Sequence, residues 1–316
     1  MFHVAADYLR RAGWTEWDVL QLPGAGVVWW IFRRGRDVPA YVGKFCRLPG
    51  AIEGGRRECA TLETLSPFAD HLGIPKVLFR TDAHGGFIYL QSGVPGKPLR
   101  NELSPADGKL LLAQMDIAEK WLEKFQTLAP PAGDSAAAFR QVLAGASEQL
   151  PELLLSAAGA ALPRLAAVPA VAVHGDFWAR NVLISPGRVS VVDWDGFHYG
   201  SPVEDLCTFA IATAYQWGLD ARQGADVIWD VLLGSSPLTV MTRAAAFRTL
   251  ARWNISRDLL APLFLIALVS RLGRTELDDN PAWHVFAARY ASAGLPPPLE
   301  TGSTPAERNQ SPPQPV

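Results

Sequence analysis

The chain has 316 residues, 49% of them hydrophobic, so it can bury a large core, and two lobes that share a cleft are plausible. The formal net charge is -2 and no long basic run occurs, which argues against nucleic acid as the main partner. The N-terminus lacks the apolar segment of a secretion signal, and residues 261–269 are too few to cross a bilayer. We therefore expect a cytoplasmic protein with no membrane partner.

Cysteine usage points to the same compartment. The chain has 3 cysteines, an odd number without metal-type spacing (Cys46, Cys59 and Cys207). We expect them to be small buried residues in a reducing environment, neither disulfides nor zinc ligands.

Residues 1–92 are predicted to form a first lobe with a five-stranded sheet and a helix. A short helix over residues 5–12 comes first, followed by a glycine. Alternating and β-branched runs, separated by turn residues, predict strands over residues 17–22, 27–32, 40–46, 74–79 and 86–90. Between the third and fourth strands we expect a glycine-containing loop over residues 48–55 and a helix over residues 56–65.

Residues 93–294 are predicted to form a larger, mostly helical lobe. A segment rich in proline and glycine, residues 90–99, leads into it, and Ser104 and Pro105 are a favourable start for a long helix that ends near Thr127. Further helices are expected over residues 136–165, 206–217, 224–233, 238–253, 259–271 and 281–291. The last part, residues 295–316, is a proline-, serine- and glutamine-containing tail that we expect to be disordered.

Between these helical segments, residues 171–205 concentrate the polar residues that can carry chemistry. Asp176 is followed five positions later by Asn181. Two short apolar runs, joined by a turn at Pro186 and Gly187, then lead to Asp193. A hairpin of this kind carries Asp176 and Asn181 before its first strand and Asp193 after its second, so the three side chains can converge on one point.

This set of side chains suits phosphoryl transfer, which depends on positioning and on charge neutralisation. Asp176 can orient an acceptor hydroxyl and take its proton. Asn181 and Asp193 offer the hard oxygen ligands that Mg²⁺ prefers, with water and phosphate completing its shell.

The motifs His174-Gly-Asp176, Asn181, Asp193-Trp-Asp195 and Pro202-Val-Glu-Asp205-Leu occur in this order. Together they resemble the aminoglycoside phosphotransferase and choline kinase superfamily, strongly over the central third of the chain and more loosely in the flanks. The resemblance implies an α+β, bilobal protein-kinase-like fold with a small β-rich N-lobe and a large, mostly helical C-lobe. The alternative is that these residues occur by chance at the strand ends and turns of an unrelated α/β protein. Four motifs in the order and at the spacing found in kinases disfavour it.

The resemblance also implies a site for ATP. Lys44, on the third strand, would contact the α- and β-phosphates, and Glu58 would pair with it. Glu53 is the other candidate for that glutamate, whereas Glu63, five positions after Glu58, faces a different way. Gly24 and Gly26 could let backbone amides approach the phosphates, although two glycines between strands more often only make a turn. The segment from Gln91 to Gly93 resembles the hinge whose backbone binds adenine.

Two further groups of residues take their roles from the resemblance. His174 and Asp205 are expected to brace the catalytic loop structurally. The acceptor is expected between this loop and the helices, where aromatic side chains can line it (Trp178, Tyr199, Tyr215 and Trp217, with Trp229, Trp253 and Trp283 as further candidates). For each of them, packing between helices is the competing interpretation.

We therefore predict an ATP- and Mg²⁺-dependent phosphotransferase that acts on a hydroxyl of a small molecule. Acidic and basic residues nearly balance over residues 201–290, which favours a sugar or amino alcohol over a polycation. The alternatives are an aminoglycoside-modifying resistance kinase and a non-catalytic nucleotide-binding pseudokinase. Oligomeric state, the choice of ATP over GTP and the roles of Arg180 and Asp195 cannot be read from the sequence.

Overall fold

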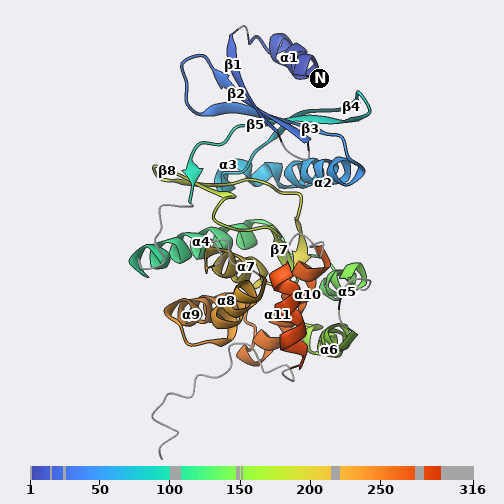
Figure 1. The fold of residues 1–316 in the computed structure, drawn as a ribbon, viewed down its shortest axis with the longest axis vertical. Coiled ribbons are helices and arrows are strands. Elements are labelled where there is room, and N and C mark those ends of the chain that lie inside the picture. Colours follow the sequence, from blue (N-terminus) through green and yellow to red (C-terminus); the bar gives the residue numbers. More distant parts are fainter. Residues whose placement is uncertain are drawn as a thin grey trace, which may run out of the picture.

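The computed structural model describes residues 2–14, 16–23, 26–99, 108–146, 150, 152–214, 221–274 and 281–292. These residues form a small β-rich lobe above a larger helical lobe (Figure 1). The predicted α+β fold with two lobes is therefore confirmed. Within the described residues, no helix has both the length and the apolar composition needed to cross a membrane.

The small lobe is built on a five-stranded antiparallel sheet in the order β1-β2-β3-β5-β4. Its strands are β1 (Trp17–Pro23), β2 (Gly26–Arg33), β3 (Pro39–Cys46), β4 (Val77–Ala83) and β5 (Gly86–Ser92). Its helices are α1 (Phe2–Arg11), α2 (Pro49–Leu65) and α3 (Ala69–Leu72), with the 3-10 turn η1 (Ser66–Phe68) between the last two. The five predicted strands are all present.

The two faces of this sheet are covered by different helices (Figure 1). On the face toward α1, Leu9 packs against Trp29, Ile31 and Phe45. On the other face, Cys59 of α2 packs against Phe87 and Tyr89. Because side chains alternate along a strand, Phe45 faces α1 while its neighbour Lys44 faces α2.

The start of α2 corrects one prediction. Residues 49–55, expected to be loop, form the first turns of this helix, which begins at Pro49. Proline at the first helical position has its backbone fixed for a helix and loses no hydrogen bond there. Gly55 lies inside the helix because the helix packs too closely on the sheet there for a side chain. A Cβ atom at this position would lie 3.0 Å from Cys46 Sγ and 3.1 Å from the Tyr89 ring.

The large lobe packs its helices around one extensive core that includes Trp121, Phe177, Trp194 and Phe209. Its helices are α4 (Gly108–Leu128), α5 (Ser135–Ala146), α6 (Glu152–Ala161), α7 (Glu204–Ala214), α8 (Ala221–Leu233), α9 (Pro237–Arg252), α10 (Leu260–Arg274) and α11 (Pro281–Ser292), with 3-10 turns η2 (Leu162–Leu165) and η3 (Arg257–Leu259). The predicted tail, residues 295–316, lies outside the described residues.

Two small sheets lie at the top of this lobe. One contains β6 (Lys97–Pro98), β8 (Val182–Ser185) and β9 (Arg188–Val191) in the order β6-β8-β9. The other pairs β7 (Val171–Val173) with β10 (His198–Gly200). The predicted hairpin corresponds to β8 and β9, whereas β6, β7 and β10 were not predicted because strands of two or three residues leave no periodic pattern.

Candidate active site

A buried ion pair joins the small-lobe sheet to its helix. Lys44 Nζ donates to Glu58 Oε2 at 2.7 Å, and Glu58 is only 1% exposed. The hydroxyl of Tyr89 donates to the same carboxylate oxygen. Burial alone would lower the pKa of Lys44, but the carboxylates of Glu58 and Asp193 raise it above its usual value. The result is a permanently charged ammonium group on the α2 face of the sheet.

The same lysine reaches across to the large lobe. Lys44 Nζ donates to Asp193 Oδ1 at 3.1 Å, a contact between residues 149 positions apart. Desolvation in the cleft would raise the pKa of Asp193, but Lys44 outweighs it and holds this pKa below its usual range. Asp193 has a φ of 71°, a conformation uncommon for residues other than glycine and often found at functional sites. Lys44 therefore brings one carboxylate from each lobe together.

Asp195 lies beside this group, close to the first turns of α2. A Cβ atom at Gly54 would lie 3.5 Å from Asp195 Oδ2. Desolvation and the neighbouring carboxylates of Asp193 and Glu58 raise the pKa of Asp195. A carboxyl group of this kind favours a nearby cation, because the cation would relieve the repulsion.

The backbone of residues 174–181, called the catalytic loop after its predicted role, is held by a buried carboxylate on α7. Asp205 is 1% exposed and accepts hydrogen bonds from the backbone N–H groups of His174, at 2.7 Å, and Gly175, at 3.0 Å. Gly175 has a φ of 85°, which suits glycine. Asp205 therefore fixes the turn that precedes Asp176.

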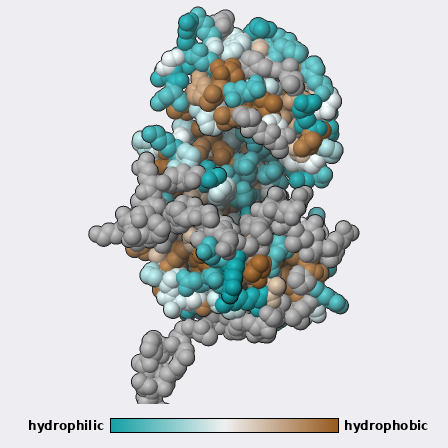
Figure 2. Space-filling view, viewed as in Figure 1, coloured by the Kyte–Doolittle hydropathy of each residue, from teal (hydrophilic) through white to brown (hydrophobic). Residues whose placement is uncertain are grey.

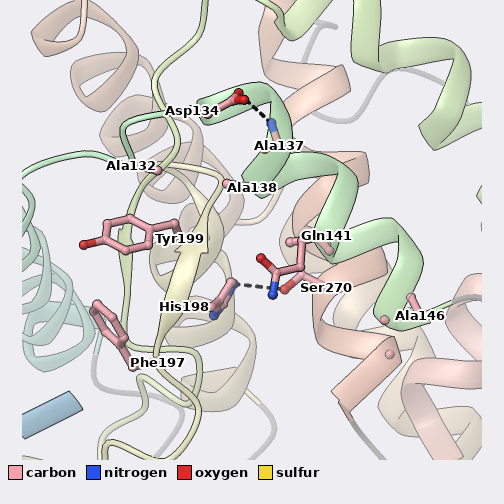
Figure 3. A pocket seen from close by; sticks show the side chains of 13 residues that line it. Ala132, Asp134, Ala137, Ala138, Gln141, Ala146, Phe197, His198, Tyr199 and Ser270 are labelled. Carbon is pink, nitrogen blue, oxygen red and sulfur yellow. Dashed lines mark hydrogen bonds between the residues drawn. The ribbon is translucent and has the colours of Figure 1, made fainter. Parts of the chain in front are cut away.

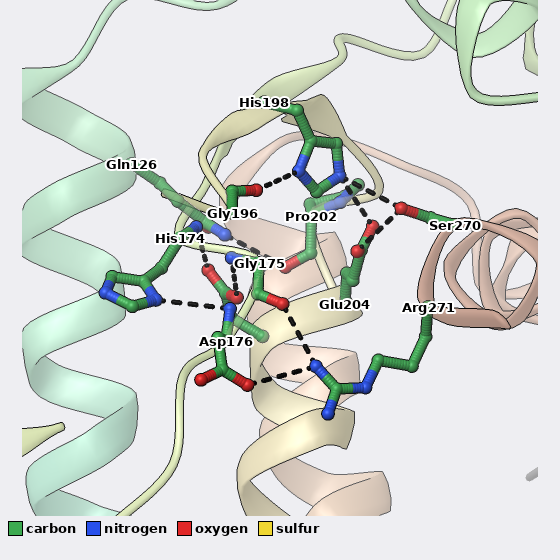
Figure 4. Close-up of polar contacts among 11 residues, drawn as sticks. Gln126, His174, Gly175, Asp176, Gly196, His198, Pro202, Glu204, Ser270 and Arg271 are labelled. Carbon is green, nitrogen blue, oxygen red and sulfur yellow. Dashed lines mark hydrogen bonds and ion pairs between the residues drawn. The ribbon is translucent and has the colours of Figure 1, made fainter. Parts of the chain in front are cut away.

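His174 links this loop to the strand that leads to Asp193. Its Nδ1 accepts the backbone N–H of Asp176 at 3.2 Å, which assigns the ring proton to Nε2 (Figure 4). Nε2 then donates to the carbonyl oxygen of Val192 at 3.1 Å. The ring also packs edge-on against Trp194, with centroids 4.5 Å apart. Because both of its ring nitrogens contact backbone groups, His174 holds the loop at Asp176 against the strand that ends before Asp193.

Asp176 and Asn181 contact each other as the sequence predicted. Asn181 Nδ2 donates to the backbone oxygen of Asp176 at 2.9 Å and to its Oδ2 at 3.1 Å. The backbone oxygen of Asn181 accepts the N–H of Val192 at 3.0 Å, which ties it to the strand before Asp193. Because Nδ2 faces Asp176, the amide oxygen Oδ1 is directed away from that carboxylate and can serve as a metal ligand.

The structure adds a residue that the sequence did not indicate. Arg271, on α10, donates from Nη1 to Asp176 Oδ1 at 3.1 Å and to the carbonyl oxygen of Gly175 at 3.3 Å (Figure 4). An arginine 95 positions from its partner, on an apolar helix, carries no local sequence signal. In the sequence, Arg271 is only one of the basic residues that balance the acidic residues over residues 201–290.

The other nucleotide-site candidates lie on the sheet and at its end. Gly26 begins β2, and a Cβ atom there would lie 2.3 Å from the carbonyl oxygen of Phe45, so close strand pairing alone requires a glycine. Gly24 lies outside the described residues. Gln91 is buried in β5, and the N–H of Gly93 donates to the carbonyl oxygen of Ala40 at 2.8 Å.

The aromatic candidates for the acceptor site are dispersed. The Arg180 guanidinium lies over the ring of Trp178, 4.9 Å from its centroid. Trp229 packs against Phe286, with centroids 6.0 Å apart, and Trp253 lies beside Gln126, so for both the packing interpretation fits. Tyr215, Trp217 and the side chain of Trp283 lie outside the described residues.

Tyr199 lines a cavity of about 580 Å³ between β10, α5 and α10 (Figure 3). Small apolar residues of α5 form one wall, and Phe197, Tyr199 and His198 form another. Ser270 Oγ lies 3.1 Å from His198 Nε2, and it donates to Glu204 Oε1 at 2.9 Å. A separate feature is seen in Figure 2: the surface is hollowed between the two lobes, and hydrophobic and hydrophilic residues lie side by side there.

The fold and this constellation define a member of the phosphotransferase enzyme family. The model of that family matches residues 30–247, more than half of the chain, so the chain belongs to it. The predicted membership in the aminoglycoside phosphotransferase and choline kinase superfamily is thereby confirmed. No curated protein matches the chain significantly in sequence.

Solved structures share the fold at low sequence identity. An aminoglycoside phosphotransferase from Streptomyces rimosus, solved with ADP and streptomycin, has a TM-score of 0.51 and 20% identity, covering 87% of this chain and 100% of that one. A protein of Thermobifida fusca, provisionally assigned as a fructosamine-3-kinase, has a TM-score of 0.53 and 15% identity, covering 92% and 98%. A type VIII aminoglycoside 3′-phosphotransferase has a TM-score of 0.51 and 18% identity, covering 84% and 98%. The bilobal fold is thus protein-kinase-like.

Proposed function

We propose that the chain is an ATP- and Mg²⁺-dependent phosphotransferase that transfers the γ-phosphoryl group to a hydroxyl of a small molecule. The observation that carries this proposal is the bridge from Glu58 through Lys44 to Asp193, at 2.7 Å and 3.1 Å. A charged lysine set by a buried glutamate is suited to nucleotide phosphates. The second contact of Lys44, with Asp193, would put a carboxylate beside those phosphates.

The roles of the individual residues follow from their surroundings. Asp176 would orient the acceptor hydroxyl and take its proton, and Asn181 and Asp193 would hold Mg²⁺ through oxygen atoms. This donor set fits the ion, which takes few protein ligands and keeps water and phosphate oxygens. A bound Mg²⁺ supplies charge neutralisation of the phosphates. The described residues contain no cluster of three or more His, Cys, Asp or Glu side chains that could hold a metal by themselves.

For the adenine, the proposed hinge is the segment from Gln91 to Gly93, and we place the boundary between the lobes there, at residues 92 and 93. The N–H of Gly93 is already bonded to Ala40. The adenine would therefore contact other backbone groups of this segment. Tyr199 and Trp178 remain the proposed acceptor-side aromatics within the described part of the chain.

The proposal is tested by ATP consumption with purified protein against neutral sugars, amino alcohols and aminoglycosides. We expect turnover with one acceptor class and a loss of about 100-fold or more in Asp176→Asn, as for removal of a catalytic base. Turnover on aminoglycosides alone would identify a resistance kinase. Binding of Mg·ATP without turnover on any acceptor would favour a pseudokinase, and lack of Mg·ATP binding would refute the proposal.

A further inference from the structure

Two donors hold the carboxylate of Asp176 from different sides. Asn181 Nδ2 donates to Oδ2, and Arg271 Nη1 donates to Oδ1, both at 3.1 Å. The two side chains of the Arg271–Asp176 pair are partly buried, at 20% and 34% exposure. Figure 4 shows the arginine reaching from α10 to the loop.

Arg271 restrains both the backbone of the catalytic loop and the side chain of Asp176. Arg271 also donates to the carbonyl oxygen of Gly175, so it contacts the backbone just before Asp176 as well as its side chain. Charge-assisted hydrogen bonds of this type are stronger and more directional than neutral ones. A carboxylate whose two oxygens each have a fixed donor keeps its orientation, which favours in-line attack by a positioned hydroxyl.

The same contact changes the electrostatic potential beside the reacting hydroxyl. An isolated Asp176 would attract an ammonium group on the acceptor, since opposite charges a few ångströms apart interact strongly in a partly buried site. The guanidinium of Arg271 offsets that attraction. An acceptor hydroxyl would approach the carboxylate of Asp176, and the guanidinium already contacts one of its two oxygens, Oδ1.

We propose that Arg271 is a positioning residue for Asp176 and a specificity determinant of the acceptor site. This inference rests on the proposed function. It holds the carboxylate in place, and it favours acceptors that carry no ammonium group next to the reacting hydroxyl. A polycation with amino groups flanking that hydroxyl is selected against.

The test compares Arg271→Met and Arg271→Lys with the control Arg248→Met. Arg248 forms a two-bond ion pair with Glu119, at 2.6 Å for each bond, in the same lobe and outside the site. Steady-state kinetics would use glucose and glucosamine, a neutral and an ammonium-bearing sugar, and basal Mg·ATP hydrolysis if neither sugar is phosphorylated. Crystal structures of the wild type and of Arg271→Met would show the position of Asp176 whatever the acceptor.

We expect Arg271→Met to lower kcat about 10- to 100-fold, with the KM for ATP changed less than about twofold and partial recovery in Arg271→Lys. The ratio of kcat/KM for glucosamine to that for glucose should rise in Arg271→Met, and its crystal structure should show Asp176 rotated. An unmoved Asp176 or an unchanged kcat would overturn the positioning role. An unchanged sugar ratio would overturn the specificity role. A wild type that does not bind Mg·ATP would instead refute the proposed function.

Discussion

Asp205 shows how a single buried carboxylate can determine the geometry of a catalytic loop. Each of its oxygens accepts one backbone N–H, from His174 and from Gly175. Replacing Asp205 by asparagine would place an NH₂ group against one of these donors. A buried donor left without an acceptor costs about 1–3 kcal/mol.

We therefore expect Asp205→Asn to lower the free energy of unfolding by about 1–3 kcal/mol and to reduce turnover as well. Urea unfolding followed by circular dichroism would measure the first effect. The control is Asp116→Asn, which removes an exposed carboxylate paired with Lys120 one turn away on α4. Equal stability changes in the two variants would contradict the bracing role of Asp205.

The cysteines give a second prediction at the scale of single residues. All three are buried free thiols, as expected from the sequence. Burial raises the pKa of Cys59 to about 12 and that of Cys207 to about 12. At pH 8 both groups are therefore protonated, and the thiol is the unreactive form.

We expect native protein at pH 8 to react slowly with Ellman's reagent, and denatured protein to release three equivalents of thiolate rapidly. Rapid modification of Cys59 or Cys207 in the folded protein, identified by mass spectrometry, would show that these sites open to solvent. Mg·ATP should not change the result, because neither thiol belongs to the proposed nucleotide site.

Helix α2 shows how a glycine can set the position of an ionic group. Gly55 lets the helix approach Cys46 and Tyr89 closely, and Glu58 follows one turn later. A methyl group at residue 55 would push the helix away from the sheet and lengthen the 2.7 Å contact between Glu58 and Lys44. Overpacking of a close contact costs about 1–3 kcal/mol.

We expect Gly55→Ala to lower both the melting temperature and the affinity for Mg·ATP. The matched control is Gly50→Ala in the first turn of the same helix, where a Cβ atom would meet nothing within 4 Å. That change should be neutral or stabilise by about 0.4–1 kcal/mol. Scanning calorimetry and titration calorimetry with a non-hydrolysable ATP analogue would compare the two variants.

The sequence was most informative where the elements are long or the motif spacing is tight. The small-lobe strands follow from apolar alternation, and the contact between Asp176 and Asn181 follows from their spacing on one loop. The contact between Lys44 and Glu58 was predicted through the family resemblance. Arg271 could not be predicted, because its contact with Asp176 depends on where α10 packs. The start of α2 was placed too late because Gly54 and Gly55 suggest a loop, and only their packing shows why they lie in a helix.

At the scale of the whole molecule, the two lobes are joined by hydrogen bonds to backbone carbonyl groups and by apolar packing. The N–H of Val191 donates to the carbonyl oxygen of Gly73 at 3.1 Å, and Trp121 Nε1 donates to that of Leu72 at 2.9 Å. The short strand β6, just after the proposed hinge, pairs with β8 of the hairpin that leads to Asp193. Apolar residues of α2 and α3, such as Leu62 and Leu72, also belong to the core of the large lobe.

The contact between Lys44 and Asp193 also joins the two lobes, but as a hydrogen-bonded ion pair between side chains. The other hydrogen bonds and the apolar packing between the lobes respond little to ionic strength, whereas a partly exposed ion pair is weakened by salt. Opening of the lobes should therefore resemble rotation about a fixed axis, with an amplitude that depends on ionic strength. Under the proposed function, Mg·ATP would engage the same two side chains. It would then replace a salt-sensitive ion pair with a ligand that holds the two lobes together.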